Sequence, residues 1–375
     1  MDTDLSVIIP CLNEQDTLPT LLEDLKKQQG IRLELIIADG GSSDNTLNLI
    51  NNFTQQSHLP VRVINSPKGR ATQMNHGAKN AKTNDFLFLH ADSRLKESNL
   101  LATALECISG FRCGFRDSGF RDTQNSDHGF RDTQNSDKLA GHFGLKFLRT
   151  NNDNPAAFYF YESKTRLNRL DSINGDQGLW ISRDYFNSLN QFDESLSYME
   201  DARLARKIFT TGTWITLPGY IHTSARRFEV EGLKERQILN SFLCNFDHIG
   251  LHEFFDLASD IYRTQSHTHK LILKPYLLMI HKIVFARGLL GACKIWYRTG
   301  AYVVENAWQL AYSLDCRNNQ RNGFEPGEGS QKNLIAYEKW IAPIITLSPG
   351  KMITAVLTFL WFNYLLLTSP SEPKT

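Results

Sequence analysis

Short runs of apolar residues alternate with helical patterns of apolar positions across the first 92 residues. The runs that indicate strands cover residues 5–9, 33–38, 61–64 and 86–89, and the helical patterns between them cover residues 17–29, 46–53 and 71–81. The strand runs do not alternate apolar with polar residues, which is typical of parallel strands covered by helices on both faces. Gly30 is expected to end the first helix at its C′ position. The pattern predicts an α/β fold with a doubly wound, mostly parallel sheet.

The pattern changes after about residue 240. Residues 261–304 contain no Asp or Glu but seven basic residues, which are separated by apolar stretches. Residues 352–368 then run for 17 positions without a charge. At this length we expect two domains: an α/β domain over residues 1–240, and a helical, membrane-associated region over residues 241–375.

A repeated segment interrupts the first domain at residues 114–137. The nine residues Gly-Phe-Arg-Asp-Thr-Gln-Asn-Ser-Asp occur at 119–127 and again at 129–137, after a shorter copy at 114–118. The segment is polar and too short to form a solenoid. We interpret it as an exposed inserted loop and assign it no chemistry.

Charge and cysteine content narrow the class of protein. The formal net charge is +1 with 22% charged residues, which argues against a nucleic-acid-binding protein. The six cysteines show no CxxC pair or zinc-ligand spacing, so we expect reduced thiols. Two acidic residues precede a five-residue apolar run at the start, whereas a secretory signal has a basic start and a longer apolar stretch. We therefore expect a cytoplasmic protein.

Polar residues follow the predicted strands, at the edge where an open α/β sheet binds ligands. Asn13 and Glu14 follow the first strand, and Asp39 and Asp44 follow the second with two glycines between them. Glycines allow a tight turn and the close approach of a ligand to the backbone. Each aspartate alone is equally well explained as a cap of a turn or helix. Together with Asn13 and Glu14 they favour a site for a nucleobase or ribose.

Two further segments carry candidate chemistry. Residues 68–78 begin with Lys-Gly-Arg and continue into a helical pattern, so Arg70 can face a phosphate or a base at a helix start. The fourth strand ends in His90-Ala91-Asp92. Because residues two apart in a strand share a face, His90 and Asp92 place two side chains with metal-ligand chemistry together.

The order of these motifs resembles glycosyltransferase family 2, whose members have the GT-A fold. The resemblance covers about residues 5–230. It includes Gly-Asp-Gln-Gly at 175–178, Met-Glu-Asp at 199–201 and Thr-Ser-Ala-Arg-Arg-Phe at 223–228. Within the family, the motifs look most like the branch called radical-SAM/selenodomain-associated transferase 2.

The resemblance implies a set of residues that bind a nucleotide-sugar donor. These are Asn13, Glu14, Asp39, Asp44, Arg70, Asp92, Arg226 and Arg227. Asp92 would also hold the cofactor, a Mg²⁺ or Mn²⁺ ion that neutralises the diphosphate, and the two later arginines would clamp that diphosphate. The family's common motif is Asp-x-Asp, and His90 replaces its first aspartate, which puts the coordination of the metal in question. His222 is left out of the site because a lone histidine at a strand end is more often structural.

The resemblance also implies catalytic residues. Asp201 would be the general base that takes the proton from the acceptor hydroxyl, with Glu200 supporting it. A single displacement of this kind inverts the anomeric configuration. The alternative is that both acids merely cap a helix, because acids in a first turn interact favourably with the helix dipole. Gly175, Asp176 and Gln177 would orient the acceptor or the donor sugar, with an ordinary turn as their alternative.

We therefore expect an inverting glycosyltransferase that uses a nucleotide-diphosphate sugar. One alternative is a sugar-phosphate nucleotidyltransferase, which would be expected to carry a loop rich in Gly and Arg after the first strand, where this chain has Pro-Cys-Leu-Asn-Glu. The other is a non-catalytic, membrane-associated scaffold with a degenerate nucleotide-binding domain. The presence of Asp92 and Asp201 counts against the scaffold.

The C-terminal region predicts contact with a membrane. Its basic, aromatic and apolar residues over 261–368 resemble an interfacial segment attracted to anionic lipid. The alternative is a helical subdomain packed on the catalytic one. A helix over 352–368 would reach roughly 26 Å, the lower limit for a span. We expect peripheral or re-entrant attachment at the inner membrane, with a cytoplasmic active site and a lipid-linked hydroxyl among the candidate acceptors.

Overall fold

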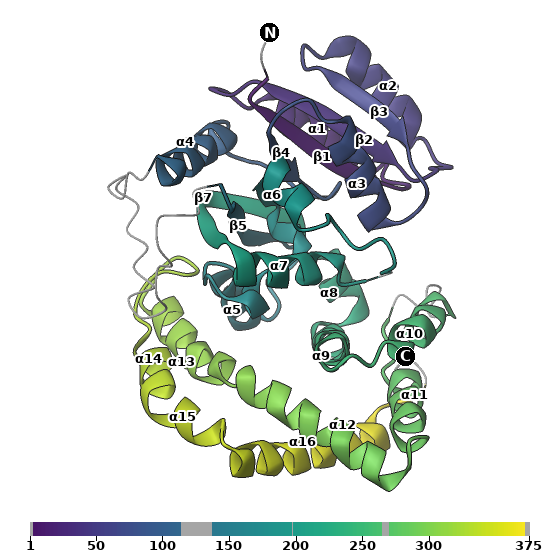
Figure 1. Cartoon of the computed structure of the whole chain (residues 1–375), viewed down its shortest axis with the longest axis vertical. Helices are drawn as coiled ribbons and strands as arrows, with labels where there is room; N and C mark the ends of the chain where they lie inside the picture. Colours follow the sequence, from purple (N-terminus) through teal and green to yellow (C-terminus); the bar gives the residue numbers. More distant parts are fainter. Residues whose placement is uncertain (1–2, 114–136, 197, 265–269, 372–375) are drawn as a thin grey trace. The chain divides into compact units, whose positions relative to one another are not determined.

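The computed structural model describes residues 3–113, 137–196, 198–264 and 270–371 (Figure 1). The chain divides into two compact units: Met1–Leu148 with Tyr161–Ser224, and Arg149–Phe160 with Ala225–Thr375. The second unit begins earlier than the boundary expected after residue 240. The reason is that Leu239 and Phe242 lie in the core of the C-terminal helices. The repeated segment at 114–137 lies outside the described residues except for Asp137.

Within the described residues, seven strands form one sheet in the first unit. Its strands are β1 (Leu5–Cys11), β2 (Leu33–Asp39), β3 (Val61–Asn65), β4 (Asp85–Phe88), β5 (Leu139–Leu148), β6 (Leu179–Ser182) and β7 (Thr213–Ser224). The spatial order is β3-β2-β1-β4-β6-β5-β7. β1 to β4 are parallel and β5 is parallel to β7, whereas β6 is antiparallel to β4 and β5. The mostly parallel sheet is confirmed, with one antiparallel strand added.

Helices cover both faces of this sheet. They are α1 (Leu18–Lys26), α2 (Thr46–Gln56), α3 (Arg70–Asn80), α4 (Leu100–Arg112), α6 (Arg183–Ser188) and α7 (Glu200–Thr211). The chain also forms the short 3₁₀ turns η2 (Leu170–Ser172) and η3 (Gly175–Gln177), and α5 (Pro155–Lys164), whose residues are divided between the two units. α1, α2 and α4 share a core with one sheet face, and α3, α6 and α7 with the other. In β1, Val7 and Ile9 enter the first core and Ile8 enters the second. Burial on both faces explains why the strands lack polar alternation.

The end of α1 differs from the prediction. The helix stops at Lys26, and Gly30 lies in the following loop with φ +73°, not at the C′ position of the helix. The backbone N–H of Gln29 donates to the carbonyl of Ser98 at 2.7 Å, a contact far away in the sequence. This tertiary hydrogen bond draws the chain out of the helical path earlier than the apolar pattern indicates.

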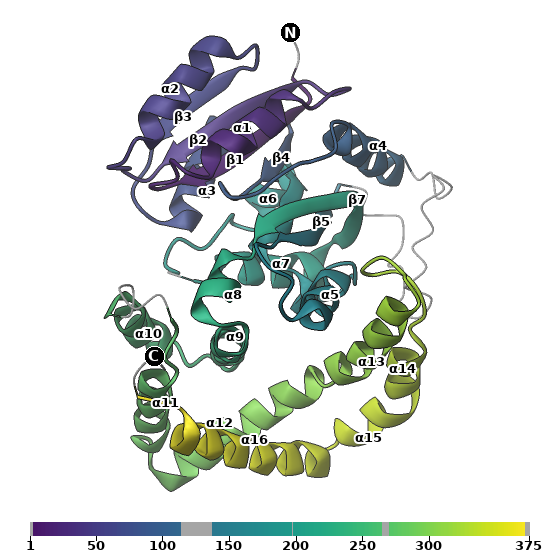
Figure 2. The same ribbon diagram turned by 180° about the vertical axis from the view of Figure 1, so that it is seen from behind.

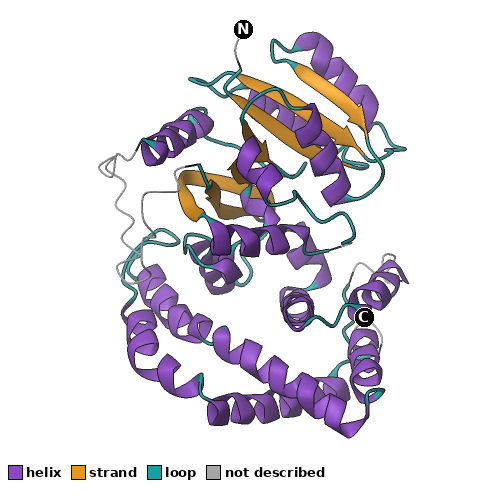
Figure 3. Ribbon diagram, viewed as in Figure 1, coloured by secondary structure: helices purple, strands orange, loops and turns teal. Residues whose placement is uncertain are grey.

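The second unit is helical over its described residues (Figures 2 and 3). Its helices are α8 (Arg226–Glu231), α9 (Leu233–Ile249), α10 (Glu253–Thr264), α11 (Lys274–Phe285), α12 (Gly288–Glu305), α13 (Trp308–Arg321), α14 (Lys332–Ala336), the π-helical η4 (Tyr337–Ile341), α15 (Ala342–Ile345) and α16 (Ser348–Thr368). α9 to α12 and α16 share one apolar core. The prediction of a helical C-terminal region is confirmed.

Candidate active site

The loops that follow β1 and β2 are hydrogen bonded to each other. The backbone N–H of Asn13 donates to Ser42 Oγ at 2.9 Å, and Asn13 Oδ1 accepts from the N–H of Ser43 at 2.8 Å. The N–H of Glu14 donates to Thr46 Oγ1 at 2.9 Å. Asn13 has φ +57°, in the left-handed region that asparagine tolerates better than most residues. The predicted nucleoside-binding residues of the two loops therefore lie together at the carboxyl edge of the sheet.

The two aspartates of the second loop bind their own backbone. Asp39 is buried, and its carboxylate accepts from the N–H of Gly41 at 3.0 Å and from Ser42 Oγ at 2.5 Å. Asp44 Oδ1 accepts from the N–H of Thr46 at 3.0 Å, beside the start of α2. Both aspartates thus have the capping contacts that were the alternative to ligand binding. Their direct contact with a nucleoside stays a prediction.

Gln73 forms hydrogen bonds with the ends of the strands from which these two loops begin, a role that the sequence did not reveal. Its Nε2 donates to the carbonyl oxygens of Cys11 at 2.7 Å and Ala38 at 2.8 Å, at the ends of β1 and β2. A Cβ on Gly40 would lie 3.0 Å from Gln73 Cδ, so glycine is needed for this approach. The feature of the sequence that could have indicated this role was a polar residue on the apolar face of α3.

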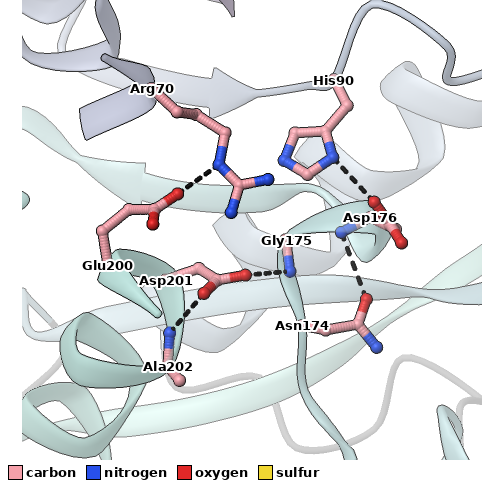
Figure 4. Close-up of polar contacts among 8 residues, drawn as sticks. All are labelled: Arg70, His90, Asn174, Gly175, Asp176, Glu200, Asp201 and Ala202. Carbon is pink, nitrogen blue, oxygen red and sulfur yellow. Dashed lines mark hydrogen bonds and ion pairs between the residues drawn. The ribbon is translucent and has the colours of Figure 1, made fainter. Parts of the chain in front are cut away.

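An ion pair connects the starts of α3 and α7. Arg70 Nε donates to Glu200 Oε1, and the Glu200 side chain is only 2% exposed (Figure 4). Met199, the residue before α7, has φ +65°. Such backbone strain in a non-glycine residue persists only where its surroundings enforce it, and it clusters at functional sites.

The predicted base, Asp201, is fixed by backbone donors. Its Oδ2 accepts from the N–H of Gly175 at 2.6 Å, and its Oδ1 accepts from the N–H of Ala202 at 2.8 Å (Figure 4). On the other side of this turn, His90 Nδ1 lies 2.7 Å from Asp176 Oδ1. Residues from η3, from α7 and from the segment after β4 therefore meet at one point.

The charge on His90 depends on its neighbours. Burial disfavours the imidazolium, but the hydrogen bond and the negative charge of Asp176 outweigh burial, and Asp92 adds to their effect. Arg70 opposes it. The net result is that the pKa of His90 is raised above its ordinary value.

The Gly-Asp-Gln-Gly turn is held by its own side chains. Asn174 Oδ1 accepts from the N–H of Asp176 at 3.2 Å, and Gln177 Oε1 accepts from the N–H of Asn174 at 2.9 Å. Gln177 is fully buried, and its Nε2 donates to the carbonyls of Phe143 at 3.2 Å and Thr165 at 3.1 Å. Its amide is therefore occupied in fixing the turn on β5. Its role in orienting the acceptor or the donor sugar stays a prediction.

Asp92 offers a carboxylate for a cation. It follows β4, it is partly exposed, and it makes no hydrogen bond or ion pair with any residue that the structure describes. The described residues contain no group of three or more His, Cys, Asp or Glu side chains that could hold a metal by themselves. Mg²⁺ is commonly bound by only one or two carboxylates together with substrate phosphates. A single free carboxylate therefore fits an ion shared with a diphosphate, and does not fit an all-protein metal site.

The remaining candidate residues take part in none of the contacts described above. His222 is in β7, and its Nδ1 has no hydrogen-bond partner in the described part of the chain. Burial, with the positive charges of Lys96 and Lys146, lowers its pKa to about 4. Arg226 and Arg227 begin α8 in the second unit, and their role at a diphosphate stays a prediction.

Comparison with known proteins identifies relatives of part of the chain. The sequence model described as Glycosyl transferase family 2 matches residues 6–168. A PGL/p-HBAD biosynthesis glycosyltransferase of Mycobacterium bovis is 38% identical over 100 residues, which are 26% of this chain and 38% of that protein. The uncharacterized glycosyltransferase YfnE of Bacillus subtilis is 34% identical over 98 residues, 26% of this chain and 25% of that protein. The matched stretch thus spans about two fifths or less of these relatives.

Among solved structures, the mannosyltransferase PcManGT from Pyrobaculum calidifontis, in complex with GDP-Man and Mn²⁺, is 15% identical. The match covers 96% of this chain and 88% of that chain, with a TM-score of 0.45. The region matched by the family model begins in β1 and includes the loops after β1 and β2, the start of α3 and Asp92. Residues 6–168 of this chain are therefore similar to glycosyl transferase family 2.

Proposed function

We propose that this protein is an inverting glycosyltransferase that moves a sugar from a nucleoside-diphosphate sugar to an acceptor hydroxyl. The observation that carries this proposal is the position of Asp201. Its carboxylate is fixed by the Gly175 N–H and lies beside the Arg70–Glu200 ion pair. The loops with Asn13 and Asp44 end at the same edge of the sheet.

In this proposal the donor binds along the carboxyl ends of β1, β2 and β4. The loops that carry Asn13, Glu14 and Asp44 would receive the base and ribose, with Asp39 shaping them from behind. Arg70 uses Nε for Glu200, which leaves the two terminal nitrogens of its guanidinium for a phosphate or base. A Mg²⁺ or Mn²⁺ ion held by Asp92 would neutralise charge on the departing nucleoside diphosphate.

Asp201 is the proposed proton acceptor. As the acceptor oxygen attacks the anomeric carbon, its proton passes to the Asp201 carboxylate. A carbon–oxygen bond to the acceptor forms while the bond between the anomeric carbon and the diphosphate oxygen breaks. Because attack and departure occur on opposite faces, the anomeric configuration inverts. The match of residues 6–168 to the family 2 model supports this proposal over a nucleotidyltransferase or a non-catalytic scaffold.

Donor binding can be tested by thermal unfolding with nucleoside diphosphates and their sugars, each with and without Mn²⁺. A ligand that binds only the native state raises the unfolding temperature by mass action. We expect one nucleoside diphosphate to stabilise the protein, and more strongly with Mn²⁺. No stabilisation by any nucleoside diphosphate or its sugars would refute the proposed donor class.

We also propose that the second unit attaches the protein to the cytoplasmic face of a membrane. Among the described helices, α16 alone has the length and apolar composition to cross one. Its outward apolar side chains recur every three or four residues and are all more than half exposed: Ile353, Leu357, Leu360, Tyr364 and Leu367. We call this set the α16 stripe. Soluble monomers rarely expose a contiguous apolar surface of this kind.

The opposite face of α16 is occupied by protein. A Cβ on Gly300 of α12 would lie 2.5 Å from Ala355 N and 2.6 Å from Ala355 Cα, so the two helices touch backbone to backbone. The two helices run side by side in both views (Figures 1 and 2). Small residues allow such close packing of helices in lipid. A packed pair with one apolar face favours peripheral or re-entrant attachment over an isolated spanning helix. A lipid-linked hydroxyl is then a candidate acceptor.

Cell fractionation tests the attachment. We expect the full-length protein in the membrane fraction, with release by carbonate or high salt for surface attachment and by detergent alone for re-entrant insertion. Replacing Leu357 and Leu360 by Glu should shift the protein to the soluble fraction, whereas Leu257→Glu on α10 should not. Finding the unmodified protein wholly soluble would refute the attachment.

A further inference from the structure

His90 and Asp201 face each other across Gly175. A Cβ built on Gly175 would lie 2.8 Å from His90 Nε2 and 2.8 Å from Asp201 Oδ2. His90 Nε2 and Asp201 Oδ2 therefore lie no more than twice 2.8 Å apart. Figure 4 shows them on either side of the Gly175 backbone. The gap between them is too narrow for a Cβ, so position 175 requires glycine.

Asp176 fixes which nitrogen of His90 faces this gap. Its carboxylate accepts the proton on Nδ1 at 2.7 Å, so Nε2 is the free edge of the ring. Nε2 has no hydrogen-bond partner among the residues that the structure describes, and the His90 side chain is 16% exposed. The ring is thus oriented by Asp176 while its second nitrogen stays available for a ligand.

The gap belongs to a pocket. His90, Gly175 and Asp201 line it together with apolar side chains that include Met74 and Trp214. A small polar group that enters the pocket would find its hydrogen-bond partners mainly in His90 and Asp201. Apolar walls make an unpaired polar group costly there, which favours ligands whose hydroxyls match both residues.

We propose that His90 and Asp201 together bind a vicinal diol of the acceptor. This inference rests on the proposed glycosyl transfer and specifies its acceptor as a sugar or other polyol. Asp201 takes the proton of the reacting hydroxyl, and His90 Nε2 accepts a hydrogen bond from the neighbouring hydroxyl. No bond to His90 forms or breaks. Protonated His90 would instead donate from Nε2 to the oxygen of that hydroxyl, so the contact holds in both states of the ring.

Binding of the diol needs both the His90 and the Asp201 side chains. A monohydric alcohol has one proton to donate, so it can satisfy Asp201 but leaves Nε2 without a donor. Adjacent ring hydroxyls can satisfy both atoms, which lie no more than twice 2.8 Å apart. His90 would therefore raise transfer to a sugar relative to transfer to a monohydric alcohol. Asp176 is a positioning residue that acts through His90.

The test is the ratio of transfer to an octyl glycoside over transfer to 1-octanol, which does not depend on the amount of active protein. The full chain is supplied with UDP- and GDP-sugars, with 1-octanol or with octyl glucoside, galactoside and mannoside as diol probes. His90→Asn retains a polar group near Nδ1 but loses Nε2, and we expect the ratio to fall about tenfold or more with the KM for an octyl glycoside raised and the KM for the donor unchanged. His90→Gln, which places an amide near Nε2, should restore part of the ratio.

Two further variants control for folding and for Asp176. His58→Asn replaces an exposed histidine before β3 and should leave the ratio unchanged. Asp176→Asn keeps an oxygen that accepts from Nδ1 and should lower the ratio less than His90→Asn does. An unchanged ratio in His90→Asn, or hydrolysis by the wild type without transfer to any of the three probes, would overturn the diol inference alone. Absence of nucleoside diphosphate release by the wild type under all conditions would instead count against glycosyl transfer itself.

Discussion

Arg70 and Glu200 form an ion pair that joins the first residue of α3 to the first residue of α7. Glu200 is buried, whereas Arg70 is 44% exposed. The pair links α3, which begins with the candidate donor-binding residue Arg70, to α7, which carries Asp201. The next residue after Glu200 is the proposed base. The pair therefore places the candidate donor and acceptor sides of the site in one rigid arrangement.

Removing Arg70 alone should leave a buried carboxylate without its partner. We expect Arg70→Met to cost about 1–3 kcal/mol of unfolding free energy, and the double variant with Glu200→Gln to recover part of that loss. Urea unfolding of the wild type, both single variants and the double variant measures the coupling. Strictly additive losses would show that the two side chains do not interact.

Asp201→Asn should remove most transfer while keeping donor binding. The amide oxygen can still accept from the Gly175 N–H, but it cannot take the acceptor proton. We expect the turnover rate to fall about 10²–10⁴-fold, with the Kd for the donor within a factor of about two. Glu106→Gln, an exposed acid on α4, is the matched control. Wild-type turnover in Asp201→Asn would exclude it as the base.

Asp92→Asn should remove the metal dependence of donor binding. Titration calorimetry with the donor, with Mn²⁺ or with chelator, is expected to show a large difference for the wild type and little for the variant. The exposed Asp184 provides a control as Asp184→Asn. Equal donor affinity of the wild type with metal and with chelator would contradict the role given to Asp92.

His142 should make the fold sensitive to acid. It is buried, with Nδ1 accepting from Trp214 Nε1 and Nε2 bonded to the Thr165 carbonyl at 3.2 Å. Burial, with Arg166 adding to it, lowers the pKa of His142 to about 3, against the opposing effect of the Thr165 bond. The folded pKa is below the unfolded value of 6.5, so this stability is present above pH 6.5 and is lost as pH falls toward 3.

The loss between pH 7 and pH 4.5 amounts to about 2–3 kcal/mol from this one group. Chemical unfolding of the wild type and His142→Gln over that range measures it. The variant should be less stable at pH 7 but should show a shallower decline with falling pH. Equal slopes for the two proteins would mean that His142 does not titrate in this way.

The sequence predicted local features well because they depend on neighbouring residues. The first four strands agree with their apolar runs to within two residues, since burial on both faces leaves a plain apolar signal. The end of α1 was wrong because the contact between Gln29 and Ser98 is tertiary. β5, β6 and β7 were not predicted, since Gly and polar residues interrupt the apolar runs of β5 and β7 and β6 is a short strand that follows a Gly-Asp-Gln-Gly turn.

Contacts distant in the sequence could not be predicted. His90 and Asp176 are 86 positions apart, and no pattern within either motif indicates that they meet. The roles of Gln73 and Gln177 also depend on carbonyl oxygens that only the folded chain brings near. In contrast, Asp92 and Asp201 could be singled out because the order of the motifs around them resembles glycosyltransferase family 2.

The most direct test of glycosyl transfer is product analysis with nucleotide-sugars labelled in the sugar. The wild-type protein is incubated with a panel of donors, and the nucleotide products and the labelled sugar are separated and identified. Our account predicts release of a nucleoside diphosphate, with the sugar transferred to an acceptor with inverted anomeric configuration, or slowly to water. Release of pyrophosphate, retention of configuration, or no reaction with any donor would contradict it.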